Sequence, residues 1–379
     1  MSTIIFSNIG FWINFIIPFA VGIYLLYTHK EYVLKEFAGQ VALTAIYLFV
    51  VFHIFFSTTT KLDDTEFWNS TTKSITYFEK WRERVTYTES YKCGKSTCYR
   101  TRTRTDFHPA FYELRTTNNE TIRIRERDYL QAKKEFGSTF VNIRRMNQIG
   151  GGGDKYVSYP NRPVPVSRPH SFINYVAAAK NSVIKRTVSE TDIEILKKRN
   201  ELVDYPKLYK AEFGATRIKR IIDRSGTGVS NELKKEFDVI ASNLGKKKHA
   251  NVIIYLTDQD RSFTEALAHY WDMGKKNDVI LVLGMKDDKV HWSDIITFTN
   301  NTDFILDMQR DFKGMKMDKE LINKFKNSVL TSYVRKPMKE FEYLAENVTL
   351  EFQWQILIVI INMILSGLLT WKMLTNRVN

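Results

Sequence analysis

Five aspartates follow predicted strands at the points where loops begin, and carboxylates in such places can bind a metal ion. They are Asp223, Asp258, Asp260, Asp287 and Asp288. Open α/β sheets bind ligands in the crevice at the carboxyl ends of their parallel strands, and Ca²⁺ prefers oxygen ligands such as carboxylates. The pattern therefore predicts a candidate Ca²⁺ site. The competing interpretation is ordinary turn and helix-cap chemistry, to which Asp is equally suited.

The other side chains that could do chemistry form no recognised arrangement. Glu265 and His269 stand four residues apart and could share a zinc ion on a helix, but no third ligand accompanies them, so a surface pair is the simpler interpretation. The glycine run 150–153 lacks the Gly-Lys-Ser/Thr ending of a phosphate-binding loop. No nucleophile elbow or Ser-His-Asp spacing occurs. We expect no catalytic residues.

A strand-helix-strand unit between Asn251 and Gly284 must position the central aspartates. The apolar runs 252–256 and 279–283 are rich in Val, Ile and Leu, as in buried strands. Between them apolar residues recur at spacings of three and four, which is typical of an amphipathic helix. These residues are Phe263, Ala266, Leu267, Tyr270 and Trp271. Such a unit places its two strands parallel.

Further elements are expected on both sides of this unit. A short strand is predicted within 217–224, and Ser230 can cap a following helix that Gly245 would end. Another strand is predicted within 289–298, and helices within 303–343.

This order of elements resembles the TPM domain family over about residues 217–345. The resembling stretches are IIDRSGTGVSNELKKEFDVIASNL, ANVIIYLTDQD and FTEALAHYWDMGKKNDVILVLGMKDDKV. Trp271 and Gly274 match the W…G pair of the family. The resemblance implies a membrane-anchored domain outside the cytoplasm that takes part in assembly or repair of membrane complexes, with Ca²⁺ binding or weak phosphatase activity in some members. The stretch 286–292 departs from the glycine-rich motif that the family places near its acidic site.

Three stretches without a charged residue predict transmembrane helices, namely 9–27, 37–57 and 352–371. Each has about the 20 apolar residues that span the hydrocarbon core. The tryptophans expected at the membrane interfaces are Trp12, Trp354 and Trp371. The few polar residues within the spans predict hydrogen bonds between helices rather than a transport path. They are Asn14, His53, Asn362 and Ser366.

Positive charges predict the orientation of these spans. Residues 1–8 carry no Lys or Arg, whereas the first loop holds Lys30 and Lys35 and the tail holds Lys372, so loop and tail should be cytoplasmic. The N-terminus and residues 58–351 would then be extracytoplasmic. The Lys-, Asn-, Ile- and Phe-rich composition resembles AT-rich bacteria or their phages, so the expected location is the bacterial inner membrane. The net charge of +14 suggests anionic surroundings such as lipid headgroups.

Residues 58–150 predict an antiparallel, strand-rich module. The stretch 58–81 is expected to be a polar connection with a helical end, and period-two alternation then predicts strands in 85–91, 98–105, 111–117 and 120–127. Cys93 and Cys98 are the only cysteines and bracket a tight connection. In an oxidising compartment they should form a disulfide at a hairpin tip; half of a metal site is the alternative.

Arginines alternate along two of the predicted strands and would line one face of each. They are Arg100, Arg102, Arg104, Arg123, Arg125 and Arg127. One interpretation is a basic strip that meets lipid headgroups, a cell-envelope polymer or nucleic acid. The other is a solvated face whose arginines pair across strands with Glu113, Glu120 and Glu126. Nucleic acid is not expected, because no nucleic-acid-binding fold signature accompanies the charge.

The sequence thus predicts an α+β membrane protein with three transmembrane helices, an extracytoplasmic antiparallel strand-rich module and a TPM-like α/β module. The expected boundaries are 1–57 for two spans, 58–150 for the strand-rich module, 151–215 for a Gly/Pro-rich linker with helices in 171–185 and 190–200, 216–345 for the α/β domain, and 352–372 for the last span. The expected function is a scaffold or assembly factor that binds the bilayer and another envelope protein or itself. A weak metal-dependent phosphatase and an oligomeric pore are the alternatives.

Overall fold

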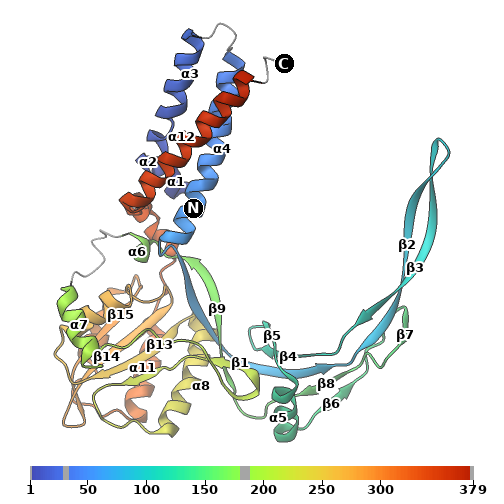
Figure 1. The fold of residues 1–379 in the computed structure, drawn as a ribbon. Coiled ribbons are helices and arrows are strands. Elements are labelled where there is room, and N and C mark those ends of the chain that lie inside the picture. The colour runs from blue at the N-terminus through green and yellow to red at the C-terminus, as the bar shows by residue number, and fades with distance from the viewer. Residues whose placement is uncertain (1, 29–33, 180–187, 376–379) are drawn as a thin grey trace.

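The computed structural model describes residues 2–28, 34–179 and 188–375 of the chain. It is an α+β protein with three parts, which are a bundle of long apolar helices, an α/β domain at one end of this bundle, and a strand-rich module (Figure 1). A long β-hairpin projects from the strand-rich module and bends back toward the side on which the bundle lies, so that the molecule has the outline of a U (Figure 1).

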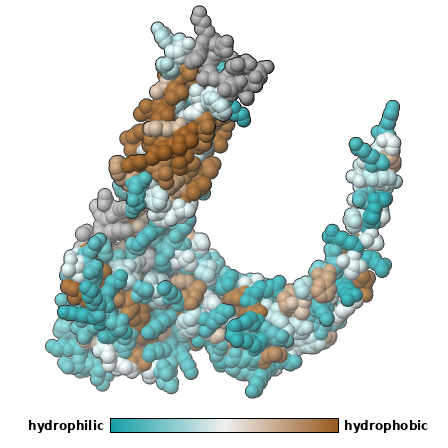
Figure 2. All heavy atoms as spheres, viewed as in Figure 1, coloured by the Kyte–Doolittle hydropathy of each residue, from teal (hydrophilic) through white to brown (hydrophobic). Residues whose placement is uncertain are grey.

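Three helices are long and apolar enough to cross a membrane, as predicted. The first span is formed by α2 (Ile9–Ile13) and α3 (Ile16–Thr28), the second is α4 (Leu34–Thr59), and the third is α12 (Phe352–Thr375). A short helix, α1 (Ser2–Ser7), precedes them. Apolar side chains on the outside of the bundle form a hydrophobic band (Figure 2). This band is compatible with association with a lipid bilayer.

The predicted interface tryptophans lie toward the ends of the spans. Trp354 stands in the first turn of α12 and Trp371 near its other end, which separates them by roughly 25 Å along the helix axis. Trp12 is 54% exposed in α2, and its indole N–H donates to the Phe6 carbonyl (2.8 Å).

Buried polar side chains tie the three spans together, as predicted for Asn14, Asn362 and Ser366, whereas His53 is exposed. Asn362 of α12 donates to the backbone oxygen (2.6 Å) and Oδ1 (3.1 Å) of Asn14, which ends α2. The Asn362 Oδ1 accepts from Tyr47 of α4 and from Ser366 (3.2 Å). Because lipid offers no hydrogen-bonding alternative, these contacts fix the packing of the helices.

The second span leads almost directly into a long strand, β1 (Asp63–Phe78). The predicted polar connection with a helical end in 58–81 is therefore wrong. Most residues in the middle of β1 are buried, including successive ones such as Glu66–Phe67 and Asn69–Ser70. A strand that is covered on both faces does not show period-two alternation. β1 is also rich in polar residues, so it lacks the continuous apolar run by which a buried strand is usually recognised.

β1 is the central strand of a six-stranded sheet. Its first half pairs antiparallel with β9 (Pro165–Ile173), and its second half lies between β4 (Phe111–Thr116) and β8 (Lys155–Ser158). β5 (Thr121–Arg123) and β6 (Thr139–Val141) complete the sheet, and α5 (Glu126–Phe136) packs on it.

The predicted linker 151–215 is therefore wrong in part, because two of its segments are strands of the β1 sheet. Residues 171–173 belong to β9 rather than to the predicted helix, which shrinks to α6 (Tyr175–Ala178). The end of that predicted helix, 180–185, lies outside the described residues. The second predicted helix is confirmed as α7 (Glu190–Lys198).

The projecting hairpin consists of β2 (Trp81–Cys93) and β3 (Ser96–His108), paired antiparallel from Trp81↔His108 to Cys93↔Ser96. We call residues 81–108 the arm. β7 (Gln148–Gly150) pairs with β2 only at the base of the arm. Cys93 and Cys98 lie at disulfide-bonding distance in its tip, with Cα atoms 5.8 Å apart, as predicted.

The α/β domain contains the predicted strand-helix-strand unit. β12 (Ile221–Asp223), β13 (Asn251–Thr257) and β14 (Asp278–Lys286) are parallel, and β15 (Lys289–Thr297) is antiparallel to β14. One face of this sheet packs on α8 (Asn231–Lys248), α10 (Thr302–Arg310) and α11 (Lys319–Ser332), and the other on α9 (Phe263–Tyr270) and α7. Short connecting elements complete the chain; they are β10 (Tyr209–Lys210), η1 (Glu212–Gly214), β11 (Thr216–Arg217) and η2 (Met338–Asn347).

The helix α8 begins as predicted but ends later than predicted. Ser230 caps it by accepting from the Leu233 N–H (3.2 Å). Gly245 does not end it: α8 continues to Lys248, and His249 closes it in the left-handed conformation (φ 54°). Gly245 instead provides a close approach to β1, which sequence periodicity alone could not reveal.

Candidate functional site

Asp223, the first of the candidate metal ligands, closes its own loop. One carboxylate oxygen accepts from the Ser225 N–H (3.1 Å) and hydroxyl (2.9 Å), and the other accepts from the Gly228 N–H (2.9 Å). Burial acts to raise the pKa of Asp223, but these hydrogen bonds outweigh it and hold the pKa below its ordinary value. The carboxylate is thus used by the turn that precedes α8.

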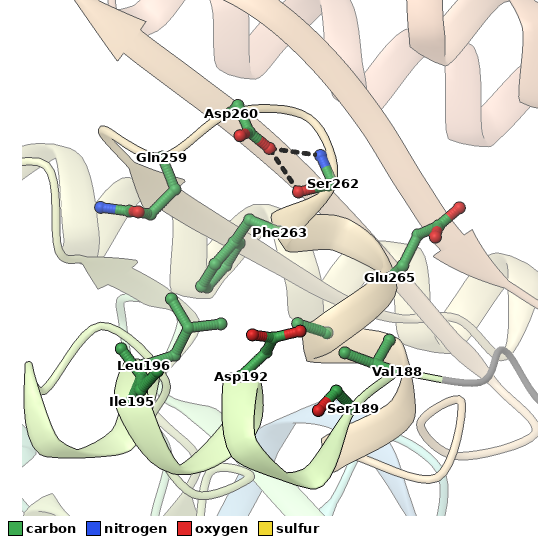
Figure 3. Close-up of a pocket in the computed structure, with 11 residues that line it drawn as sticks. Val188, Ser189, Asp192, Ile195, Leu196, Gln259, Asp260, Ser262, Phe263 and Glu265 are labelled. Carbon is green, nitrogen blue, oxygen red and sulfur yellow. Dashed lines mark hydrogen bonds between the residues drawn. The ribbon is translucent and has the colours of Figure 1, made fainter.

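The other four aspartates also take turn and cap positions. Asp260 accepts from the N–H (2.8 Å) and the hydroxyl (2.5 Å) of Ser262 at the start of α9 (Figure 3). Asp287 and Asp288 have φ values of 51° and 58° in the two-residue turn between β14 and β15, and Asp258 is exposed. No three His, Cys, Asp or Glu side chains of the described residues lie close enough to hold a metal ion. The Ca²⁺ site stays a prediction without a ligand cluster.

A cavity of about 400 Å³ opens beside Asp260, between α7 and the start of α9 (Figure 3). Its wall combines apolar side chains such as Leu196 and Phe263 with the carboxylates of Asp192 and Asp260. The Asp260 carboxylate is turned toward Ser262 and already serves the helix start (Figure 3). No basic side chain and no nucleophile–base pair stands among its lining residues, so we assign no ligand to it.

The two residues that carry the family resemblance have structural roles in the turn after α9. Trp271 is buried, and its indole N–H donates to the Val203 carbonyl (2.9 Å). Gly274 has φ 76°, and a Cβ atom there would lie 2.8 Å from Asp278 Oδ2. Both residues suit a tight connection between α9 and β14 whatever the family.

A buried polar cluster joins β1 to the amino ends of the parallel strands. Arg220 donates to the Oδ1 atoms of Asn69 on β1 (2.5 Å) and Asn251 on β13 (2.9 Å). Asn251 donates to Asp278 Oδ1 (2.8 Å), which also accepts from the Tyr205 hydroxyl (3.1 Å). Burial raises the pKa of Asp278 to about 6 and lowers the pKa of Arg220. These groups bond to one another and to neighbours such as Ser167 and the Lys275 N–H, so the cluster fixes the position of β1.

Ion pairs beside this cluster hold the membrane-proximal part of β1. Glu66 is 1% exposed and accepts two hydrogen bonds from Arg335 (3.0 and 2.8 Å), and Lys276 lies 3.2 Å from it. Asp64, on the same face of β1, pairs with Lys275 (2.5 Å). We call the polar cluster and these pairs together the β1 joint. Sequence reasoning missed it, although the acids at spacing two and the Lys275–Lys276 pair were a signal.

The arm has two chemically different faces, because directly opposite residues of an antiparallel pair project to the same side. One face, which we call the paired face, carries the predicted arginines of β3 together with acids that lie within ion-pair distance of them. Arg100 and Arg102 lie 2.8 and 2.6 Å from Glu89, and Arg104 lies 2.9 Å from Asp106. Arg100 and Arg102 are therefore compensated across the hairpin and Arg104 along its own strand, but by other acids than the three predicted.

The opposite face, which we call the hydroxyl face, combines basic side chains with hydroxyl groups and has no acid. Its members are Arg82, Arg84, Thr86, Thr88, Ser90, Lys92, Thr97, Tyr99, Thr101, Thr103, Thr105 and Phe107, all of them exposed. Figure 2 shows the arm as largely hydrophilic. Sequence reasoning singled out the RTRTRT arginines and missed this face, because only the register with β2 brings its members together.

The second predicted arginine strip is wrong. Arg123 is the last residue of β5, opposite Glu113. Arg125 precedes α5 and lies 3.3 Å from Asp128, and Arg127, in the first turn of α5, lies 3.7 Å from the same carboxylate. The period-two pattern ends where α5 begins, and both arginines pair with Asp128 in the first turn of this helix.

Comparison of the chain with protein-family models, curated proteins and solved structures gives no match. The resemblance to the TPM domain family therefore stays a prediction.

Proposed function

We propose that this chain is a membrane-anchored scaffold or assembly factor that docks another envelope protein, or a second copy of itself, outside the cytoplasm. The observation that carries the proposal is the arm. Its two strands of 13 residues each project from the module with every member of one face exposed. A solitary ribbon of this length has little core of its own to stabilise it, which favours a role in contact with a partner.

The free edge of β3 is the part of the arm best suited to bind protein. Within the described residues β3 pairs only with β2, whereas β2 is also covered at its base by β7. An open strand edge offers backbone N–H and C=O groups to an added strand. Arginines along such an edge hinder indiscriminate pairing and favour a partner strand of complementary charge.

The β1 joint fixes the position of the arm relative to the α/β domain, as a scaffold requires. β1 begins at the end of α4, is held by the joint against the α/β domain, and ends next to the arm. A contact made by the arm is thereby held at a set position relative to the membrane. The bundle, the α/β domain and the arm would act as anchor, platform and docking element.

We place residues 58–351 outside the cytoplasm of a bacterium, with the chain in the inner membrane. The α/β domain lies at the end of the bundle where α4 ends and α12 begins (Figure 1). Lys35 and Lys372 belong to the opposite ends of these helices, which supports a cytoplasmic position for them. The Cys93–Cys98 pair suits an oxidising compartment.

The experiment that tests the proposal compares the full chain with a short-arm variant after extraction in a mild detergent. In the variant, residues 85–104 are replaced by Asn-Gly, which closes the hairpin between Arg84 and Thr105. These residues lie directly opposite each other, and Asn-Gly forms a two-residue hairpin turn. We expect the full chain to have a defined native mass with a second protein, or with further copies, at a fixed ratio, and the variant to lose it.

A control distinguishes loss of docking from loss of folding. The short-arm variant keeps the pairing of β2 with β7, so its thermal unfolding in detergent should match that of the full chain. A full chain that is monomeric and free of any partner at a fixed ratio would refute the scaffold role. So would a well-folded short-arm variant that keeps the same complex.

The two alternatives have no specific observation in their favour. Of the carboxylates that suggested a metal-dependent phosphatase, Asp223 and Asp260 accept hydrogen bonds within their own loops, and Asp287 and Asp288 lie in a two-residue turn. The polar side chains that could have lined a pore bond to one another between the spans.

A further inference from the structure

We propose that the hydroxyl face of the arm binds the anionic headgroups of the bilayer in which the chain is anchored. This inference goes beyond the proposed scaffold role, which needs only a protein contact at the edge of β3. It assigns a different ligand to a different surface of the same hairpin, and the two contacts can exist together.

The charge of the hydroxyl face favours an anionic ligand. Arg82 and Arg84 stand near the base of the arm and Lys92 near its tip, so positive charge extends along its length. No ion pair within the described part of the chain neutralises these three side chains, in contrast to the arginines of the paired face. Between them lie rows of hydroxyl groups, with Thr86 directly opposite Thr103. Guanidinium, ammonium and hydroxyl groups all donate to phosphate oxygens.

The apolar content of the hydroxyl face favours a headgroup layer over an acidic protein. Its two large apolar or aromatic side chains stand far apart, Tyr99 near the tip (71% exposed) and Phe107 near the base (59% exposed). A protein interface has an apolar centre with clustered aromatic anchors, whereas the centre of this face consists of threonines. Aromatic residues at the ends of a polar surface are typical of contact with the membrane–water interface.

The direction of the arm brings it to the membrane. Figure 1 shows the arm rising beside the bundle, with its tip level with the helices that span the bilayer. A flat bilayer around these helices would occupy the same level, and the hydrophilic arm (Figure 2) cannot enter the hydrocarbon layer without losing the hydration of its charges. In a membrane the arm must therefore lie against the headgroups, tilted away from the position of its tip in Figure 1, and the anchor keeps it there at a high local concentration.

The expected strength follows from the number of basic side chains. Each Lys or Arg near an anionic surface favours binding by about fivefold, so three of them favour the docked arm by about a hundredfold. Salt screens this attraction over roughly 10 Å at 0.1 M. Docking should thus depend on anionic lipid and weaken at high ionic strength.

Hydrogen–deuterium exchange of the full chain in nanodiscs tests the inference. One set of nanodiscs contains phosphatidylcholine alone, and the other contains an equal part of phosphatidylglycerol. We expect the backbone amides of residues 81–108 to exchange severalfold more slowly with phosphatidylglycerol, and this slowing to disappear at 0.5 M salt. Exchange in β13 should be the same in both, since the core is not affected.

Two matched variants locate the contact. Arg82→Gln/Arg84→Gln/Lys92→Gln removes three positive charges from the hydroxyl face and should abolish the slowing. Arg100→Gln/Arg102→Gln/Arg104→Gln removes the same charge from the paired face and should keep most of it. Unchanged exchange in β13 shows that each variant is folded.

Three results would overturn the inference. Equal exchange of the arm in both lipids means that no anionic headgroup is bound. Slowing that is lost equally in both triple variants means that overall charge, and not the hydroxyl face, is responsible. If the arm exchanges more slowly in phosphatidylcholine nanodiscs once a co-purifying protein is added, and phosphatidylglycerol has no effect, the hydroxyl face binds protein. The scaffold proposal is tested separately, because its native-mass measurement is made in detergent without anionic lipid.

Discussion

Gly245→Ala should loosen the contact between α8 and β1, although the same change stabilises most helices. Gly245 lies inside α8 and faces β1. A Cβ atom at this position would lie 2.5 Å from the Cβ and 2.5 Å from the carbonyl oxygen of Asn69. Both atoms are held in place by the backbone of Asn69, so a change of side-chain rotamer cannot relieve the overlap.

Three contributions decide the sign of the effect. Alanine improves helix propensity by about 1 kcal/mol over glycine. Overpacking against a fixed neighbour costs about 1–3 kcal/mol. Moving Asn69 also disturbs its buried hydrogen bonds to Arg220 (2.5 Å) and Asn251 (3.0 Å), and an unsatisfied buried group costs about 1–3 kcal/mol. The net expectation is a loss of about 1–5 kcal/mol, or a fall of at least about 2 °C in the midpoint of thermal unfolding.

Thermal unfolding of the full chain in detergent, followed by tryptophan fluorescence, measures this effect. Asn243→Ala is the matched control, because Asn243 is an exposed residue of the same helix and alanine there should add several tenths of a kcal/mol. Gly39→Ala in α4, where a Cβ atom meets nothing within 4 Å, should not destabilise the chain and can add up to about 1 kcal/mol. If Gly245→Ala were as stable as Asn243→Ala, the close approach of α8 to β1 would be wrong.

Three further predictions concern the joint, the bundle and the topology. Burial raises the pKa of Asp278 from 3.8 to about 6. The stability of the chain relative to Asp278→Asn should therefore be highest below about pH 4 and should fall by up to about 3 kcal/mol as the pH rises from 4 through 6. Unfolding midpoints of the two proteins that change in parallel from pH 4 to 7 would contradict this. Asn362→Leu leaves Asn14 and Tyr47 without their shared partner and should cost about 1 kcal/mol, and adding Asn14→Leu should cost little more if the two act as a unit. After reduction, a membrane-impermeant maleimide should label Cys93 and Cys98 on intact cells, and labelling that requires permeabilisation would reverse the proposed topology.

Local patterns were sufficient for the spans and for the core of the α/β domain. The runs around Ile253 and Leu281 are apolar throughout because both faces of a parallel sheet are covered by helices. The helix between them carries its apolar residues at helical spacing. Each of these signals lies within about twenty residues, so neighbouring elements were not needed to read it.

The strand-rich module was predicted less well because its pairing is not local. β1 pairs with β9 about a hundred residues later in the chain, for example Asp63 with Ile173, and no short-range pattern indicates such a partner. The alternation after Thr121 was interpreted as one strand, but it continues only to Arg123 before α5 begins. A pattern of Thr and Arg is compatible with both a strand and the first turn of a helix.

The sequence by itself determined the class of this protein: three apolar spans, a disulfide hairpin, and a strand-helix-strand unit, each specified by residues close together in the chain. Only the tertiary structure decided which charges are free. The register of β2 with β3 places Glu89 against Arg100 and Arg84 opposite Thr105, and the folding of β1 onto the α/β domain buries Glu66 against Arg335. Charge compensation depends on distances of a few ångströms between residues from separate segments, and such distances are set by the packing of the whole chain.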